Sequence, residues 1–277
     1  MLNDYLPFID NSKYSELQLI SYCLKKSQDW VSYSDVKTSL GITNYKLKQL
    51  IENINKIGLI KIEVKISQRN FIRLSGANEA NLQKMVNYTA VNSLRFKVFL
   101  NLFMNVDSCT REELQEKEGI SAATYFRSKN ALFQSLGKET VKTVSTSESQ
   151  LRLLLTDVLY MFKYDKLFAT SEVSERIHTL TKTLMTALHL NLTANQQEKF
   201  FYFCWVNYLR YQTGLTFQTN DREQFLEKSN LAELAAFKKQ VTEFLPSLSN
   251  LDIENFQRFC LSFLKLPLNA QPEKMLA

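Results

Sequence analysis

Four of the six glycines in this 277-residue chain recur at one spacing. Gly119 lies 78 residues after Gly41, and Gly137 lies 79 residues after Gly58. In each copy the first glycine interrupts a helical pattern in a short turn, and the second ends the longer helix that follows. Glycine suits both places because it tolerates the positive φ angles of tight turns and helix C-termini. The spacing therefore predicts a duplicated helix–turn–helix unit, which constrains the fold more than any other feature of the chain.

The two copies, residues 34–58 and 112–137, share the same order of signals. Each has a short helix, a Gly-Ile turn, a hydroxyl residue and a helix of about four turns. Thr43 and Ser121 suit the N-caps of the longer helices because a side-chain oxygen accepts free backbone amides there. The residues expected to face the core recur at helical spacing, and they are Leu47, Leu50, Ile51, Ile54 and Ile57 in the first copy and Tyr125, Leu132 and Leu136 in the second.

The opposite faces of the two longer helices carry hydrogen-bond donors and positive charge. A helix of this kind fits the major groove of DNA, where its N-terminal residues reach base edges. The candidate contacts are Thr43, Asn44, Tyr45, Lys46, Lys48 and Gln49 in the first helix and Ser121, Ala123, Thr124, Arg127 and Asn130 in the second. Asn53 is also expected on the outer face of the first helix. The alternative is that each copy is a helical hairpin with no role in binding nucleic acid.

A β-hairpin is predicted directly after the first copy. Residues 59–66, LIKIEVKI, alternate between apolar and charged side chains, which is the period of a strand. Residues 67–70 read as a turn and residues 71–74 as a second short strand. A hairpin after a recognition helix is a wing, and Arg69 at its tip is a candidate contact to a phosphate or the minor groove, against the alternative of a solvated turn. After the second copy, residues 141–155 predict a shorter wing.

The rest of the chain is expected to be helical. Six glycines and four prolines are about a third of average usage, and so few breakers favour a mainly α fold. Residues 13–27 and 92–104 predict a helix ahead of each copy. Further helices are expected at 151–163, 171–189, 194–213, 229–245 and 251–265. Residues 200–211 are apolar nearly all round, which favours a buried helix over a ligand pocket.

Charge is divided unequally along the chain. Residues 1–150 hold 20 Lys and Arg against 15 Asp and Glu, whereas residues 151–277 hold 14 against 13. A basic half joined to a near-neutral half favours a polyanion-binding part and a regulatory part, although a pI near 9.0 is also common in proteins without such a partner. We therefore predict a winged helix-turn-helix domain at 1–76, a second at 77–150, and an all-helical regulatory or dimerisation domain at 151–277.

No catalytic or cofactor motif is visible in the sequence. The four cysteines are too far apart for a zinc site, and we expect free buried thiols. His178 and His189 have no partners at catalytic or metal-ligand spacing. We expect neither an enzyme nor a bound metal or cofactor. The N-terminus lacks a signal-peptide pattern and no apolar run is long enough for a membrane, so a cytoplasmic protein is expected.

The two copies also carry a family resemblance. The second, GISAATYFRSKNAL, follows an S-x-x-T-x-x-R-x-x-x-x-L pattern at Ser121, Thr124, Arg127 and Leu132. With LGITNYKLKQLIENIN in the first copy, it resembles the Mga-type virulence and stand-alone response regulators of low-GC Gram-positive bacteria, over roughly residues 12–137. The later helices look like a degenerate phosphotransferase-system regulatory domain, and by analogy His178 is a candidate phosphoacceptor. Members of that family are usually much longer than this chain.

Three interpretations of the function remain open at this point. The leading one is a homodimeric transcription regulator that binds double-stranded DNA through residues 43–53 and 121–130. Its helical domain would receive an effector or a regulatory protein. The second is a plasmid replication initiator, which also pairs two winged-helix units, although the near-neutral helical second half favours a regulator. The third is a helical adaptor that binds other proteins through its aromatic second half.

Overall fold

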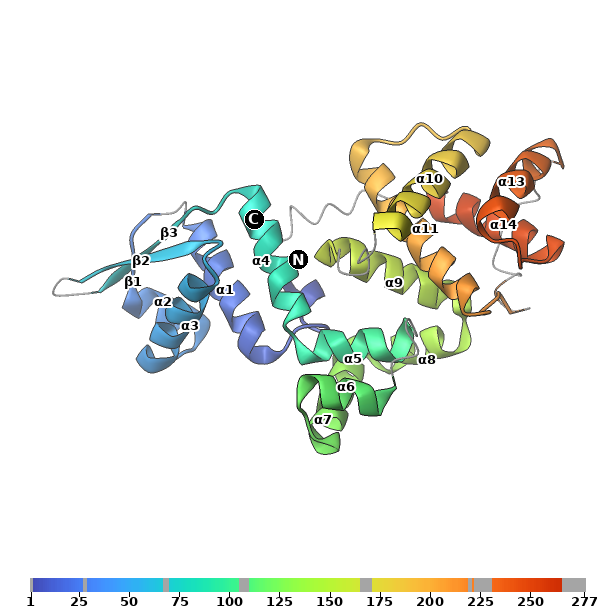
Figure 1. Cartoon of the computed structure of the whole chain (residues 1–277). Coiled ribbons are helices and arrows are strands. Elements are labelled where there is room, and N and C mark those ends of the chain that lie inside the picture. The colour runs from blue at the N-terminus through green and yellow to red at the C-terminus, as the bar shows by residue number, and fades with distance from the viewer. Residues whose placement is uncertain are drawn as a thin grey trace. The chain divides into compact units, whose positions relative to one another are not determined.

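The computed structural model describes residues 2–26, 29–66, 70–104, 110–164, 171–218, 221 and 231–265. Within them the protein is mainly helical, as predicted, with one small three-stranded sheet (Figure 1). Its contacts divide it into two compact units. The first comprises Met1–Phe99 and Ala122–Ser135, and the second comprises Leu100–Ser121 and Leu136–Ala270.

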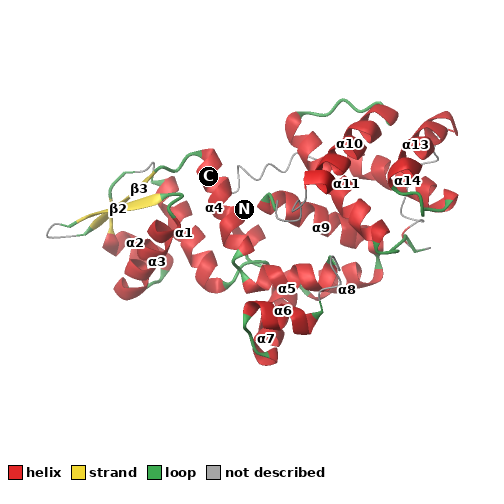
Figure 2. Ribbon diagram, viewed as in Figure 1, coloured by secondary structure: helices red, strands yellow, loops and turns green. Residues whose placement is uncertain are grey.

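Three helices and the sheet make up the beginning of the first unit. The elements are α1 (Asn11–Lys25), β1 (Val31–Ser32), α2 (Tyr33–Leu40), α3 (Asn44–Ile57), β2 (Lys61–Lys65) and β3 (Phe71–Ser75). All pairings are antiparallel in the order β1-β3-β2, so β3 is the central strand. Figure 2 shows β2 and β3 in yellow beside the helices of this unit. α1 packs against β3, and α3 packs against β2. These bounds confirm the helix predicted at 13–27 and the strands predicted at 59–66 and 71–74.

The ends of α2 and α3 are set by local chemistry. Gly41 follows α2 with a φ of 64°, and Gly58 follows α3 with a φ of 77°. Both adopt the left-handed conformation that the sequence predicted for them, which favours glycine because a side chain is strained there. Thr43 caps α3, because its Oγ1 accepts the backbone N–H of Lys46 at 3.2 Å. Gly41 and Thr43 therefore fix the turn between α2 and α3, and Gly58 ends α3.

The apolar face of α3 forms much of the core of this unit. Leu47, Leu50, Ile51 and Ile54 are buried as predicted, together with Ile62 of β2 and Ile72 and Leu74 of β3. Ile57, also predicted to face inward, is only half-buried. Asn55 joins α3 to β2, since its Oδ1 accepts the N–H of Ile62 at 2.7 Å and its Nδ2 donates to the carbonyl of Ile62 at 2.9 Å. These two bonds fix the point at which the hairpin leaves the helix.

Two more helices follow the sheet, α4 (Glu79–Val91) and α5 (Leu94–Phe103). α5 confirms the helix predicted ahead of the second copy. Its start is tied to the start of α1 by Asp10, whose Oδ2 accepts the N–H of Leu94 at 2.8 Å. A carboxylate is stabilising at that place because the N-terminus of a helix carries partial positive charge. The backbone N–H of Asp10 in turn donates to Ser93 Oγ at 2.9 Å.

The second copy folds as α6 (Arg111–Glu118) and α7 (Ala122–Leu136). A capping box opens α6: Thr110 Oγ1 accepts the N–H of Glu113 at 3.2 Å, and Glu113 Oε2 accepts the N–H of Thr110 at 2.7 Å. Gly119 ends α6 with a φ of 62°, as its match to the first copy predicted. The chain reenters a helix within three residues, so the helix–turn–helix pattern of the sequence is present in both copies.

The shorter wing predicted at residues 141–155 is wrong. This segment folds as α8 (Lys138–Thr146) and α9 (Glu148–Phe162). Serine and threonine lower helix propensity because their hydroxyls compete for backbone groups, but here they are satisfied inside the helix. The hydroxyls that donate to carbonyls four residues earlier belong to Thr143, Ser145 and Thr146. In the described residues, the second copy is therefore followed by helices and not by a hairpin.

The second unit is built on helices. Besides α9 it contains α10 (Ser171–Ala187), α11 (Ala194–Gln212), α13 (Leu231–Phe244) and α14 (Asn250–Lys265). α11 packs against α9 and α10, and α13 packs against α10 and α14 (Figure 1). The middle of α11 is buried, and the ring of Phe203 stacks on that of Phe263 with centroids 4.1 Å apart. This confirms the buried helix predicted at 200–211. Among the described helices, none is long and apolar enough to cross a membrane.

A buried ionic network joins α9 to α11. Arg152 is 0% exposed, and its Nε donates to Glu148 Oε1 at 2.8 Å and its Nη1 to Asn207 Oδ1 at 2.9 Å. Arg210 shares the same carboxylate, with its Nε 2.8 Å from Oε1 and its Nη2 2.5 Å from Oε2. The guanidinium of Arg152 also lies 4.2 Å from the ring centroid of Tyr211. Two buried arginines therefore share one largely buried carboxylate.

Asp221 caps α9 from a distant part of the sequence. Its Oδ1 accepts hydrogen bonds from Ser147 Oγ at 2.6 Å, from Ser149 Oγ at 2.9 Å and from Ser149 N–H at 3.0 Å. Burial acts to raise the pKa of Asp221, but these hydrogen bonds outweigh burial and hold the pKa below its ordinary value. The carboxylate is therefore ionised at neutral pH, the form that suits a helix N-terminus.

Candidate nucleic-acid interface

The N-terminal half of α3 presents most of the DNA contacts predicted for the first copy on one exposed surface. Asn44, Lys48 and Gln49 are exposed, and Tyr45 is 78% exposed, the highest value for a large aromatic side chain in the described residues. A tyrosine in this position exposes apolar area to water that a ligand surface can cover. The side of α3 opposite its buried leucines and isoleucines is therefore open along its first two turns.

Lys46 and Gln49 are linked on this surface. Lys46 Nζ donates to Gln49 Oε1 at 3.2 Å, one turn apart on α3. The bond orients the amide of Gln49 so that its Nε2 is the group left to donate outward. Because the pair is exposed, the bond is weak and exchanges readily for a ligand contact.

Asn53 was predicted on the outer face of α3, and this prediction is wrong. Its Nδ2 donates to Glu16 Oε1 of α1 at 3.1 Å, and Glu16 is buried. Lys13 of α1 pairs with the same carboxylate, with Nζ 3.3 Å from Oε1. Asn53 thus supplies a hydrogen bond to a buried carboxylate, which needs such a partner because it is shielded from water. The helical period of α3 does not reveal this bond, because Glu16 belongs to another helix. Asn53 is therefore not part of the exposed surface at the start of α3.

The outer face of the sheet adds groups that the sequence did not single out. Arg73 of β3 pairs with Glu63 of β2, with Nη2 2.7 Å from Oε2, and the bond from Arg73 holds the pKa of Glu63 below its ordinary value. The guanidinium of Arg73 also lies 4.9 Å from the ring centroid of Trp30, and Lys65 Nζ lies 6.0 Å from that centroid. Lys61, two residues before Glu63, is exposed on the same face of β2. The register of the two strands places Glu63 opposite Arg73. Pairing the predicted strands in that register would have identified this group from the sequence.

The end of β2 exposes apolar side chains. Ile66 is 83% exposed, and Val64 is exposed as well, although both continue the buried side of the strand that holds Ile62. The inner face of β2 therefore covers the core as far as Ile62, and the apolar side chains after it are open to water. Arg69, the predicted contact at its tip, lies outside the described residues.

A second polar surface lies on α7. Ser121, Ala123, Arg127 and Asn130 are exposed and Thr124 is half-buried, while Tyr125 and Leu132 are buried as predicted and Leu136 is half-buried. Arg127 extends along its own helix, with Nη2 3.4 Å from Thr124 Oγ1 and Nε 3.4 Å from the carbonyl of Ala123. Phe126 is exposed beside it. The predicted residues thus form two separate groups, one on α3 and one on α7.

The two histidines lie in the second unit. His178 is exposed on α10, and its ring stacks on Phe201 of α11 with centroids 4.2 Å apart. His189 follows the end of α10 with a φ of 51° and donates its backbone N–H to the carbonyl of Thr186 at 3.2 Å. It therefore acts as the C-terminal stop of that helix, a place where glycine is more usual. In the described residues, no three His, Cys, Asp or Glu side chains gather as metal ligands would.

The thiols of Cys23, Cys204 and Cys260 are expected to resist alkylation in the folded protein. All three are buried; burial raises the pKa of Cys23 and of Cys204 to about 12 and holds that of Cys260 well above its ordinary value. Because the thiolate is the nucleophile, reaction with iodoacetamide near pH 8 should be slower by about a hundredfold or more than in urea. Mass spectrometry of timed samples measures this. Fast modification of any of the three before unfolding contradicts the packing; Cys109 lies outside the described residues.

The groups on α3, α7 and the sheet can donate hydrogen bonds, neutralise anionic charge and cover flat apolar surface. Their common property is an exposed array of amide, hydroxyl, aromatic and cationic side chains on stable elements. No family model matches this chain, and a search of the curated proteins found no match either.

Proposed function

We propose that the first 76 residues form a winged helix-turn-helix module that binds duplex DNA. The observation that carries the proposal is the element order α1-β1-α2-α3-β2-β3 with the antiparallel sheet order β1-β3-β2. This is the arrangement in which the helix after the turn enters the major groove and the hairpin lies beside it. The N-terminal half of α3 carries exposed polar side chains.

Each exposed group has a role that its chemistry suits. Asn44 and Gln49 are amides of the kind that bind base edges, and Tyr45 offers a ring that can cover a thymine methyl group. Lys46 and Lys48 on α3 neutralise phosphates on either side of the groove. On the hairpin, exposed lysines on β2 do the same for the neighbouring backbone. Arg73 and Glu63 pair with each other, so they stabilise the hairpin and are not proposed to contact DNA.

The second copy is proposed to provide a further DNA contact through α7, where Arg127 and Asn130 are exposed. It lacks a described hairpin of its own, so its contact rests on the helix alone. The resemblance of both copies to Mga-type regulators supports a role in transcription. The helices from α9 to α14 then serve regulation or dimerisation of the regulator. A plasmid replication initiator remains the alternative, but α8 to α14 contain no winged unit in the described residues.

Selection of bound duplexes from a random pool, followed by fluorescence anisotropy, tests the proposal. We expect one enriched motif and an affinity that falls steeply with salt. Four phosphate contacts would give a slope of about −3.6 in log affinity against log salt concentration, since each contact contributes about −0.9. Absence of duplex binding at low salt would leave the helical adaptor as the better interpretation. Enrichment of tandemly repeated sites typical of replication origins would favour the initiator.

A further inference from the structure

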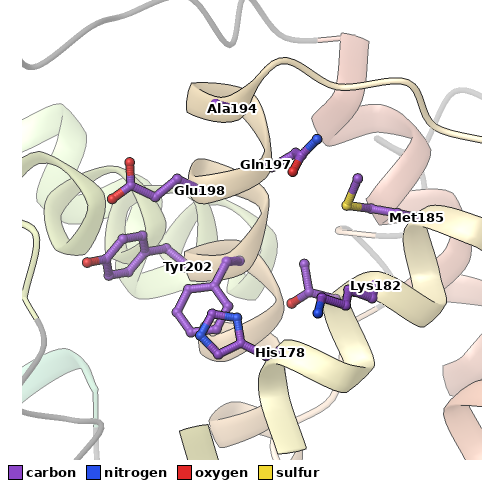
Figure 3. Close-up of a pocket in the computed structure, with 9 residues that line it drawn as sticks. His178, Lys182, Met185, Ala194, Gln197, Glu198 and Tyr202 are labelled. Atoms are coloured by element: carbon purple, nitrogen blue, oxygen red, sulfur yellow. The ribbon is translucent and has the colours of Figure 1, made fainter. Parts of the chain in front are cut away.

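The second unit contains a pocket between α10 and α11. Its volume is about 420 Å³, which lies within the range of small-molecule sites. Figure 3 shows Lys182 and Met185 on one helix and Gln197, Glu198 and Tyr202 on the neighbouring one. The pocket lies within one compact unit, so its shape does not depend on the placement of the rest of the chain.

One wall of the pocket is apolar and fixed in position. Phe201 and Tyr202 project from the buried middle of α11, and both rings are almost wholly buried. Met185 of α10 contributes a flexible thioether, a side chain that adapts to irregular ligands. His178 stacks on Phe201 with an interplanar angle of 22°, which holds the imidazole at the edge of this wall. A ligand with an apolar body can therefore bury its surface here.

The polar groups of the pocket leave a positive charge unbalanced. Glu198, the one acid that lines the pocket, is already paired, because Lys163 Nζ donates to its Oε2. Gln197 is held by a 2.8 Å bond from its Nε2 to the carbonyl of Leu192. Lys182 lies on the exposed face of α10 one turn from His178, and within the described residues no acid pairs with it. A lysine ammonium beside an imidazole attracts an anion with two hydrogen-bond acceptors.

We propose that this pocket binds a small organic carboxylate. The carboxylate accepts hydrogen bonds from Lys182 Nζ and from the imidazole of His178, and the apolar body lies on Phe201, Tyr202 and Met185. A carboxylate fits better than inorganic phosphate because the volume beside the two donors is lined by apolar side chains. The inference concerns the second unit alone and holds whether or not the first unit binds DNA.

Methyl NMR of the full chain labelled at methionine tests the proposal directly. The chain has six methionines, and the signal of Met185 is assigned by its loss in Met185→Leu. Phenylacetate is the probe, and phenylacetamide is the matched neutral control of the same shape. We expect the Met185 signal to shift and saturate with phenylacetate, and to respond about tenfold more weakly to the amide because the charge-assisted bond is lost.

Two variants separate the proposed contact from a general charge effect. Lys182→Met should weaken phenylacetate binding about tenfold or more, whereas Lys239→Met, at an exposed lysine on α13, should leave it unchanged. Equal shifts from the acid and the amide, or an unchanged affinity in Lys182→Met, would overturn the assignment of a carboxylate. An unmoved Met185 signal with both phenylacetate and hexanoate at about 20 mM would overturn the site itself, since that excludes even weak binding.

Discussion

Asn44→Ala combined with Lys48→Ala is expected to lower the affinity of the full chain for its selected duplex by about a hundredfold or more. Both side chains are exposed at the start of α3, so their removal takes away one base contact and one phosphate contact without disturbing the core. A good base contact contributes about 1–3 kcal/mol of discrimination, and a phosphate contact adds affinity for any sequence. Fluorescence anisotropy with the selected duplex and with a scrambled duplex measures both effects.

Made singly, the two substitutions should change DNA binding in different ways. Asn44→Ala should reduce the preference for the selected duplex over the scrambled one. Lys48→Ala should weaken both duplexes alike and make the salt slope shallower by about 1. Lys56→Ala is the matched control, since Lys56 is an exposed lysine in the last turn of the same helix. If the Asn44/Lys48 variant binds like the natural chain, or if Lys56→Ala costs as much as Lys48→Ala, α3 is not the recognition helix.

Glu148→Gln is expected to destabilise the second unit by about 3–5 kcal/mol. The neutral amide leaves Arg152 and Arg210 without the carboxylate that they share. Removing one partner of a buried ionic group is costly because the remaining charges are then buried without compensation. The change in shape is minimal, so the loss reports charge rather than packing. Urea unfolding measures it, with a lowered midpoint as the expected result.

Tryptophan fluorescence can isolate this unit in the full chain. The sequence has two tryptophans, and Trp205 is buried in α11 of the second unit whereas Trp30 lies in the first. A Trp30→Phe background therefore leaves one reporter, which matters because a chain of two units need not unfold in one step.

Glu254→Gln provides the matched control for the buried network. Glu254 pairs with Arg258 one turn along α14, and the two side chains are 32% and 29% exposed. Such a pair between adjacent turns of one helix, still open to water, contributes about 1 kcal/mol or less. A loss in Glu148→Gln no larger than in this control would show that the network is not a source of stability.

The first copy shows how far local sequence chemistry reaches. Gly41, Gly58 and Thr43 act on backbone groups within a few residues, and all three have the conformation or bond that their type predicted. The strand period of β2 likewise follows from alternation along a few residues. These features are readable because each depends on neighbours in the chain.

The errors arise where a distant partner or a competing local preference decides. Asn53 has the helical phase of an outer residue, but it bonds to the buried acid Glu16 of another helix. Residues 141–155 contain strand-favouring types, yet the hydroxyls of α8 bond back to their own helix and the segment stays helical. Neither outcome follows from period or propensity, because both depend on which hydrogen-bond partners the folded chain supplies.

The sequence by itself determined the duplicated turns, the position of the longer helix after each turn, and the hairpin after the first of these helices. These features depend on φ preferences, caps and periodicity over short distances. The tertiary structure alone decided which polar residues are buried and what they meet. Glu148 and Arg210 are 62 positions apart, and Ser147 and Asp221 are 74 apart, so no local pattern pairs them. The pocket between α10 and α11 belongs to the same class, because a cavity exists only once two helices have packed side by side.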